Sequence, residues 1–293
     1  MESSKNNSLL LTGASGFVGS AILAGLRSSY DITTAGRSAS SDIIADLICP
    51  LPDLPRRFGT VVHAAGLAHA AQGLFDAVNV TGTANLCHAL EAAGVPDTFI
   101  YISSVAVYGL TEGTDVTESY PLNATTPYGL SKIKAERFLT RWARAHGIRL
   151  VILRPALVYS PDAPGNIAAM RRAMAGHYYF SIRPNLARKS IVSPTDLADA
   201  VAVAIAANEA SGPYNICDSS NPRFTDLEEA VAGACGYKRP RKLPLCIAWV
   251  LARIGDILPF RTPIDTHRLR KITSTLTFSN SRATALGWHP GRD

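Results

Sequence analysis

The sequence has no C-x-x-C pair, no uninterrupted apolar run long enough for a membrane span, and no long run of basic residues. Its five cysteines are scattered and form no C-x-x-C pair, which favours reduced thiols over a zinc site or a disulfide framework. The longest apolar stretch, Leu243 to Phe260, is interrupted by Arg253 and Asp256, which argues against a membrane span. Met1 to Ser8 is polar and no secretory hydrophobic region follows it. We therefore expect a cytoplasmic protein.

The composition is that of a globular protein. Its 293 residues are 47% hydrophobic and 18% charged, enough for one large domain or two modest ones with a sizeable core. The net charge is +6, from 29 basic and 23 acidic residues, which suits either an ordinary basic protein or one that prefers anionic ligands. No basic run is long enough to indicate a nucleic-acid partner, and no metal site is expected.

The most informative segment is Leu9 to Gly19, with the sequence LLLTGASGFVG. An apolar run leads into a G-x-x-G-x-x-G pattern, and helical spacing resumes at Val18, so the segment is typical of strand, glycine turn and helix N-terminus. Gly13 permits the turn, Gly16 lets a phosphate approach, and Gly19 lets the helix pack closely. The free N–H groups of such a helix start favour a pyrophosphate. The pattern alone also fits a structural turn in another α/β protein.

Strand and helix patterns alternate from residue 9 to residue 155. This alternation predicts an α/β fold with a Rossmann-type, doubly wound parallel sheet. The expected strands are 9–11, 31–35, 43–47, 60–65, 98–103, 149–153 and 213–217, and the expected helices are 18–26, 75–93, 127–146, 194–207, 227–236 and 245–257, with loop beyond. The expected division is residues 8–160 with 190–217 for the dinucleotide-binding domain, and residues 161–189 with 218–293 for a smaller C-terminal substrate-binding region.

Three side chains form a candidate catalytic group. Tyr128 and Lys132 lie four residues apart on an expected helix, so they share one face. A lysine ammonium beside the phenol favours the phenolate and is expected to lower the tyrosine pKa, which makes a proton shuttle near neutral pH. Ser104 stands where an expected strand meets a loop, at the sheet edge that lines the ligand crevice in doubly wound folds.

At this point the chain resembles a known family, the extended short-chain dehydrogenases/reductases, and within it the nucleotide-sugar epimerase, dehydratase and reductase group. The resemblance runs from Leu9 to Pro290. It is carried by TGASGFVG (12–19), VVHAAG (61–66), NVTGTANL (79–86), YISSVAVYG (101–109), PYGLSK (127–132), LRPALVYSP (153–161) and LGWHP (286–290).

The resemblance implies a role for each matching residue. Tyr128 would be the acid/base, Lys132 its partner and a ribose ligand, and Ser104 the ligand of the substrate oxygen. Ser104 matches rather than Ser103, because the hydroxyl residue of the family stands four before the tyrosine of V-Y-G, here Tyr108. Asn79 resembles the family's structural asparagine, and Asp46 with Leu47 the pair that meets the adenine ring. The implied cofactor set is Gly13, Ser15, Gly16, Phe17, Val18, Gly19, Arg37, Asp46, Leu47, Ala64, Ala65, Gly66, Asn79, Tyr128, Lys132 and Pro155.

Two departures from the family pattern bear on the expected reaction and on the expected cofactor. Dehydratases of the family carry Asp-Glu directly after the active-site hydroxyl residue, but Val105 and Ala106 follow Ser104 here, so a dehydratase is not expected. NAD-specific relatives place an acid at the end of the second strand, where this chain has Arg37. An arginine there suits the 2′-phosphate of NADP(H), so NADP(H) is favoured over NAD(H).

For the substrate, Asn166 resembles the asparagine that contacts the diphosphate. Lys189 stands where relatives carry a diphosphate-binding arginine, and a lysine supplies charge without the bidentate fork. Arg268 and Arg270 are further candidates for phosphate contacts, or else ordinary surface cations.

These observations predict NADPH-dependent reduction of a 4-keto sugar carried on a nucleotide diphosphate or a similar pyrophosphate, such as a lipid pyrophosphate. The alternative is a nucleotide-sugar 4-epimerase with bound NAD, which would use the same residues. A non-catalytic NADP(H)-binding regulator is a minor alternative. The resemblance also implies a homodimer.

Leu243 to Phe260 has a wide apolar stripe, preceded by four basic residues between positions 238 and 242. It predicts either a core helix of the substrate region or an interfacial helix on anionic lipid. In the second case the protein would contact the membrane surface peripherally.

Overall fold

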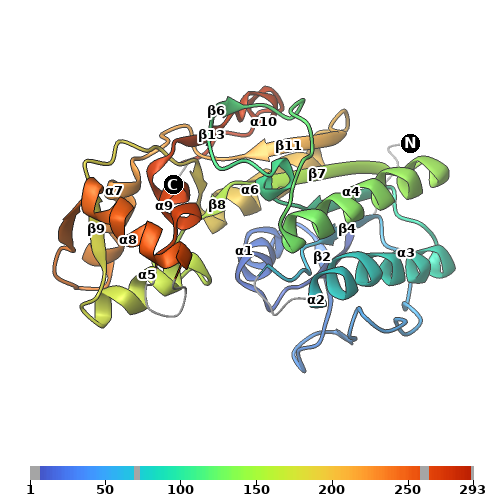
Figure 1. Ribbon diagram of the computed structural model, residues 1–293. Helices are drawn as coiled ribbons and strands as arrows, with labels where there is room; N and C mark the ends of the chain where they lie inside the picture. Colours follow the sequence, from blue (N-terminus) through green and yellow to red (C-terminus); the bar gives the residue numbers. More distant parts are fainter. Residues whose placement is uncertain (1–6, 69–72, 258–263, 292–293) are drawn as a thin grey trace.

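A computed structural model describes residues 7–68, 73–257 and 264–291; the polar stretch expected at residues 1–6 lies outside them, as do Leu258 and Phe260. The centre of the larger lobe is a sheet of seven parallel strands in the order β11-β7-β5-β4-β1-β2-β3 (Figure 1). This confirms the α/β, doubly wound fold. The strands are β1 (Ser8–Thr12), β2 (Asp31–Gly36), β3 (Ile43–Ile44), β4 (Thr60–His63), β5 (Thr98–Ile102), β7 (Arg149–Pro155) and β11 (Gly212–Ile216).

Helices cover both faces of this sheet, because alternate strand residues point to opposite sides. On one face, Leu9 and Leu11 pack with α1 (Phe17–Leu26) and α6 (Pro194–Ala206). On the other face, Leu10 packs with α3 (Gly82–Ala93) and α4 (Pro127–His146). The strands are apolar on both sides for this reason, as parallel sheets require.

The smaller lobe is built mainly from the second half of the chain (Figure 1). It contains structure that the sequence pattern did not predict, namely α5, α9 and several short strands. Its elements are α5 (Asn166–Ala175), β9 (Phe180–Arg183), α7 (Phe224–Ala234), β12 (Arg241–Pro244), α8 (Leu245–Ile257) and α9 (Thr266–Thr273). Three two-stranded parallel pairs join distant segments: β10 (Ile191–Val192) with β8 (Leu157–Val158), β12 with β9, and β13 (Leu276–Phe278) with β6 (Gly113–Val116).

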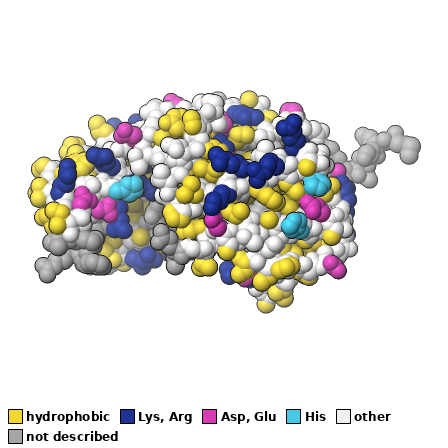
Figure 2. Space-filling model, turned by 45° about the vertical axis from the view of Figure 1, so that its right-hand side comes forward, with side chains coloured by type: hydrophobic (Ala, Val, Ile, Leu, Met, Phe, Trp, Pro, Cys, Tyr) yellow, Lys and Arg dark blue, Asp and Glu magenta, His cyan; other side chains and the backbone are white. Residues whose placement is uncertain are grey.

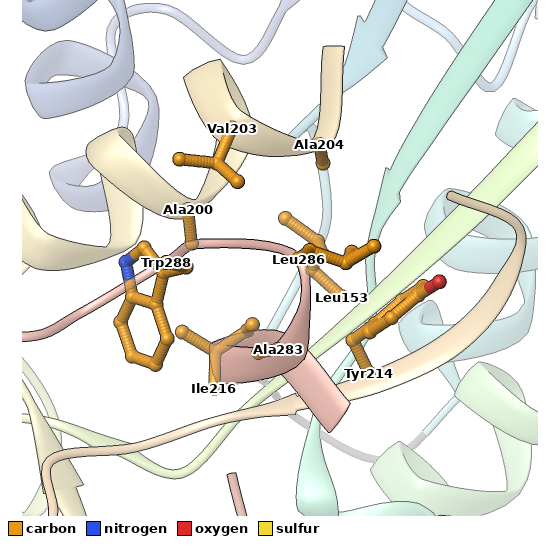
Figure 3. A pocket seen from close by; sticks show the side chains of 9 residues that line it. All are labelled: Leu153, Ala200, Val203, Ala204, Tyr214, Ile216, Ala283, Leu286 and Trp288. Carbon is orange, nitrogen blue, oxygen red and sulfur yellow. The ribbon is translucent and has the colours of Figure 1, made fainter. Parts of the chain in front are cut away.

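The C-terminal segment returns to the larger lobe, which differs from the expected boundary at residue 218. Helix α10 (Ser281–Ala285) and Trp288 pack against β7, β11 and α6, around an apolar void of about 10 Å³ (Figure 3). The Trp288 indole donates a hydrogen bond to the backbone oxygen of Asp196 on α6, at 3.0 Å. So small an apolar void reflects side-chain packing and offers no ligand site.

The expected helix 75–93 is divided. It begins as α2 (Leu74–Asp76), widens into the π-helical turn η1 (Ala77–Thr81), and continues as α3. Such turns are common at functional sites, and this one carries Asn79. A short 3-10 helix, η2 (Val105–Tyr108), follows β5. No helix among the described residues is long and apolar enough to cross a membrane.

Candidate active site

The glycine turn between β1 and α1 is closely packed. Gly13 has φ +78°, and a Cβ added there would lie 2.5 Å from the backbone nitrogen of Ala65. A Cβ on Gly19 would lie 2.0 Å from the carbonyl oxygen of Gly13. Gly16 is the N-cap of α1 and carries no capping side chain, and the first turn of the helix has no acid. The turn therefore fits the pyrophosphate of a dinucleotide, because N–H groups and the positive end of the helix dipole meet there.

Other residues of the expected cofactor set line the same edge of the sheet. Arg37 directly follows β2 and is exposed, as are Ser15 and Asp46. Leu47 is buried, and its backbone oxygen accepts a hydrogen bond from Asn85 on α3 at 2.8 Å. Phe17 and Val18 are partly buried in the first turn of α1, and Pro155 is buried at the end of β7.

The segment after β4 is held by Asn79. Its side chain accepts a hydrogen bond from Leu67 N at 2.8 Å and donates to Leu67 O at 3.0 Å and to Ser131 Oγ at 2.9 Å. Ala64, Ala65 and Gly66 lie in this segment. Asn79 thus connects the loop after β4 to α4.

Ser104, Tyr128 and Lys132 come from two elements that meet at the carboxyl end of β5. Ser104 follows β5 and caps η2, its hydroxyl accepting a hydrogen bond from Ala106 N at 3.1 Å. Tyr128 lies in the first turn of α4, next to Pro127. The buried ammonium of Lys132, one turn later, donates to Ile102 O at 2.9 Å. The structure therefore brings together Ser104, Tyr128 and Lys132, the three residues of the predicted catalytic group.

The electrostatics differ from the expectation that Lys132 lowers the Tyr128 pKa. Burial raises the pKa of Tyr128, and a hydrogen-bonding interaction with the Ser104 side chain opposes that rise. Burial also lowers the pKa of Lys132 to about 8, against the opposing charge of Glu136. The expectation was wrong because the spacing of two residues on a helix does not determine how much water each side chain loses on folding. It also does not predict that the Ile102 carbonyl holds the Lys132 ammonium.

A buried polar network behind this site was missed. Glu136 accepts hydrogen bonds from Arg154 on β7 and from Ser103 Oγ, and Arg154 also donates to the Tyr108 phenol at 3.0 Å. The Tyr108 phenol donates in turn to Asn215 Oδ1 at 2.7 Å. One signal was present in the sequence, since Glu136 stands four residues after Lys132 and shares its helix face.

A second buried group lies beneath the glycine turn. The His63 ring is 2.7 Å from Thr12 Oγ1 and 3.0 Å from Thr83 Oγ1, so its nitrogens join β1 to α3. Burial, with a contribution from the charge of Lys132, lowers the pKa of His63 to about 3. This histidine is therefore neutral at physiological pH and acts as a structural link.

The expected substrate ligands lie in or beside the smaller lobe. Asn166 is exposed at the start of α5. The Lys189 ammonium donates to Ser274 O at 2.6 Å, and burial with the nearby charge of Lys271 lowers its pKa to about 8. Arg268 and Arg270 are exposed on α9, and Arg268 pairs with Asp265 at 3.4 Å.

The sequence model of the NAD dependent epimerase/dehydratase family matches residues 9–217, a span that holds the glycine turn and the Ser104, Tyr128 and Lys132 group. The chain belongs to this family. The family assignment confirms the expected resemblance, and with it an NAD(P)-dependent enzyme and a site that binds a nicotinamide nucleotide.

The relatives of this chain catalyse different reactions. UDP-glucose 4-epimerase of Vibrio cholerae is 30% identical, over 97% of this chain and 90% of the relative. GDP-6-deoxy-D-mannose reductase of Pseudomonas aeruginosa is 27% identical, over 76% and 79%. N-acetyl-alpha-D-glucosaminyl-diphospho-ditrans,octacis-undecaprenol 4-epimerase of Escherichia coli O157:H7 is 27% identical, over 97% and 90%. The structure of RMD from Pseudomonas aeruginosa, complexed with NADPH, shares the fold with a TM-score of 0.72 at 23% identity, over 97% of this chain and 94% of that one.

Proposed function

We propose that this protein is an NADPH-dependent reductase of a 4-keto sugar carried on a nucleotide diphosphate or a similar pyrophosphate. The observation that supports this most directly is the meeting of Ser104, Tyr128 and Lys132 at the carboxyl end of β5. Val105 and Ala106 follow Ser104, so no carboxylate stands there to remove a proton from the sugar, as a dehydratase would need.

Each residue has one task in the proposed reaction. A nicotinamide nucleotide, when bound, would supply the hydride. The Ser104 hydroxyl donates a hydrogen bond to the C4 oxygen, and this bond strengthens as the oxygen gains negative charge. The Tyr128 phenol gives that oxygen its proton. A raised tyrosine pKa suits an acid that must hold its proton until the alkoxide forms.

Lys132 has a supporting role in the proposed reaction. Its ammonium is fixed by Ile102 O and lies 4.7 Å from the centre of the Tyr101 ring, where a cation is favoured. We assign to it the ribose hydroxyls of the cofactor and the stabilisation of the Tyr128 phenolate after proton transfer. The turn with Gly13 and Gly16 would hold the pyrophosphate, while Gly19 lets α1 pack close to it. Asn166 and Lys189 would hold the substrate diphosphate.

NADP(H) is proposed as the cofactor because Arg37 follows β2 directly and is exposed. A guanidinium there can pair with a 2′-phosphate. The second candidate is a 4-epimerase that keeps NAD bound, supported by the 30% identity to the Vibrio cholerae epimerase. It would use the same three residues to oxidise C4 and then reduce it from the other face.

Two measurements separate these candidates. The supernatant of the boiled protein is chromatographed for bound cofactor, and NADPH oxidation at 340 nm is followed with a nucleotide-linked 4-keto-6-deoxy sugar. We expect NADPH or an empty site, and NADPH consumption that depends on the keto sugar. Stoichiometric NAD in the supernatant, with interconversion of UDP-glucose and UDP-galactose without added cofactor, would establish the epimerase instead.

The proposal includes a cytoplasmic location and a homodimer. Sedimentation velocity of the full chain tests the dimer, and fractionation of cells tests the location. A surface of the smaller lobe bears on whether the sugar substrate is carried by a nucleotide or by a lipid.

A further inference from the structure

Helix α8 buries small side chains and exposes five large apolar ones, while Leu245 and Trp249 pack against the buried residues of the smaller lobe. Ala248, Ala252 and Gly255 form its buried side. The large apolar residues that point to solvent are Ile247, Val250, Leu251, Ile254 and Ile257, with exposed fractions from 36% to 78%. A surface helix of a soluble protein usually turns its apolar stripe toward the core, whereas five large apolar residues of α8 face solvent.

These five side chains form one surface, which we call the α8 face. They recur at spacings of three and four residues, so they lie in a single stripe along the helix. Phe180, at the start of β9, is a further exposed aromatic residue of the same lobe, 44% exposed, and β9 pairs with β12, the strand that leads into α8. A continuous exposed apolar stripe of this kind marks an interaction site.

The segment of sequence that contains α8 is basic. Residues 238–271 contain nine of its 29 basic residues and two of its 23 acidic ones, a net +7 where the whole chain has +6. The remainder of the molecule is therefore close to neutral. At the left end of the molecule in Figure 2, hydrophobic and basic side chains lie next to one another, with acidic side chains among them.

Both acids of this segment have partners within it. Asp256 accepts hydrogen bonds from Thr266 N at 3.0 Å and from its hydroxyl at 3.1 Å, which tie α8 to α9. Asp265 caps α9 by accepting from Arg268 N at 2.7 Å. Arg241, Lys242 and Arg253 are exposed. Glu228 and Glu229 line the same hollow as Arg239 and Lys242, so the positive charge is offset in part on that side.

An apolar stripe bordered by cations fits an anionic lipid surface. A second copy of the chain would fit poorly, because a two-fold interface places the same patch on itself and would bring like charges together. We propose that the α8 face docks on the surface of a bilayer that contains anionic lipid. Its apolar side chains enter the boundary between head groups and acyl chains, and the cations lie among the head groups.

This inference rests on the proposed function and deepens it, since it favours a lipid pyrophosphate over a nucleotide as the carrier of the sugar. Asn166, Lys189 and Arg268 lie in or beside the lobe that would contact the membrane. An enzyme that docks there meets its substrate at the surface of the bilayer.

The test is co-sedimentation of the full-length protein with vesicles of phosphatidylcholine and phosphatidylglycerol, and with vesicles of phosphatidylcholine alone. We expect binding to the anionic vesicles at low salt, about tenfold or more above binding to the neutral ones, and a loss of binding at high salt. The double variants Val250→Ser/Ile254→Ser and Arg241→Gln/Lys242→Gln should each weaken it about tenfold or more. Ile44→Ser, an exposed isoleucine of the larger lobe, is the matched control and should bind as the wild type does.

Every variant is checked for unaltered NADPH affinity and thermal unfolding, which separates loss of docking from loss of folding. Absence of binding to anionic vesicles at low salt overturns the docking surface and leaves the proposed reductase to be judged by its own assay. Equal binding to neutral vesicles, or equal binding by the variants and the wild type, overturns it too. A change from dimer to monomer in Val250→Ser/Ile254→Ser, with vesicle binding intact, would assign the α8 face to contact between copies instead.

Discussion

The Glu136 carboxylate on α4 accepts two hydrogen bonds from the Arg154 guanidinium on β7, from Nε at 3.0 Å and from one terminal nitrogen at 2.6 Å. Both side chains are buried, with exposed fractions of 4% and 5%. The pair fixes the helix that carries Tyr128 and Lys132 to the central sheet. The negative charge of Glu136 raises the pKa of Lys132, which opposes the lowering caused by burial.

We expect Glu136→Leu to lower the free energy of unfolding by about 3–5 kcal/mol, because it leaves the Arg154 charge buried without its partner. Urea unfolding of the full chain measures this. The double variant Glu136→Leu/Arg154→Met should recover most of the loss, since an apolar pair needs no charge compensation. If the double variant is no more stable than Glu136→Leu, the pair is not the source of the effect.

Tyr128→Phe removes the proton donor and keeps the ring. Turnover of the keto sugar should fall about a hundredfold or more, the scale of general acid catalysis, while the dissociation constant for NADPH changes little. Tyr30→Phe, which removes a phenol at the far end of α1, is the matched control and should leave turnover intact. Near-normal turnover in Tyr128→Phe would exclude this residue as the acid.

Ser104→Ala should lower kcat more than it raises KM, because its hydrogen bond to the C4 oxygen is strongest in the transition state. The substitution also removes the cap of η2, so its stability is measured alongside. Ser104→Thr keeps the hydroxyl and should restore most of kcat. An effect on KM alone would show that Ser104 serves only ground-state binding.

Arg37→Asp should shift the preference from NADP(H) toward NAD(H) by about tenfold or more, because it removes one charge-assisted bond and repels the 2′-phosphate. Dissociation constants for both cofactors, measured by quenching of protein fluorescence, test this. Arg27→Asp makes the same charge change at an exposed position after α1 and should leave the preference unaltered. A wild-type protein that already prefers NAD(H) would contradict the assignment and favour the epimerase.

His63 should make the stability of the protein fall in acid. Its pKa is about 3 in the folded chain and near 6.5 when unfolded, so between these values the unfolded chain binds a proton that the folded chain does not. The free energy of unfolding therefore decreases as the pH falls from 6.5 toward 3, by up to about 1.4 kcal/mol per pH unit from this group. His63→Gln should flatten that dependence, measured by urea unfolding at several pH values, whereas His88→Gln, at an exposed position, should not.

Local sequence determined the central sheet and the helices around it. The apolar runs of β1, β4, β5 and β7 admit only strands covered on both faces, and α4 is bounded by Pro127 and Gly147, which start and stop a helix by their own conformational limits. A spacing of four on that helix was enough to place Tyr128 and Lys132 on one face. The G-x-x-G-x-x-G pattern likewise predicted a turn whose close contacts the structure bears out.

Tertiary structure decided what depends on residues far apart in the chain. The pairing of β6 with β13 joins segments about 160 residues apart, and each is too short to carry a pattern of its own. Trp288 packs in the larger lobe because α6 and β11 provide its cavity and the Asp196 carbonyl its hydrogen bond. Neither contact can be predicted from the local sequence.

The electrostatics of the site were also decided by the fold. The sequence placed a lysine near a tyrosine, but only packing determines how much water each keeps, and desolvation raises the Tyr128 pKa and lowers that of Lys132. The same holds for α8, whose apolar residues the sequence assigned either to a core helix or to an interfacial one. Which side of a helix is buried depends on what packs against it, and here the fold buries the alanines and leaves Val250 and Ile254 in solvent.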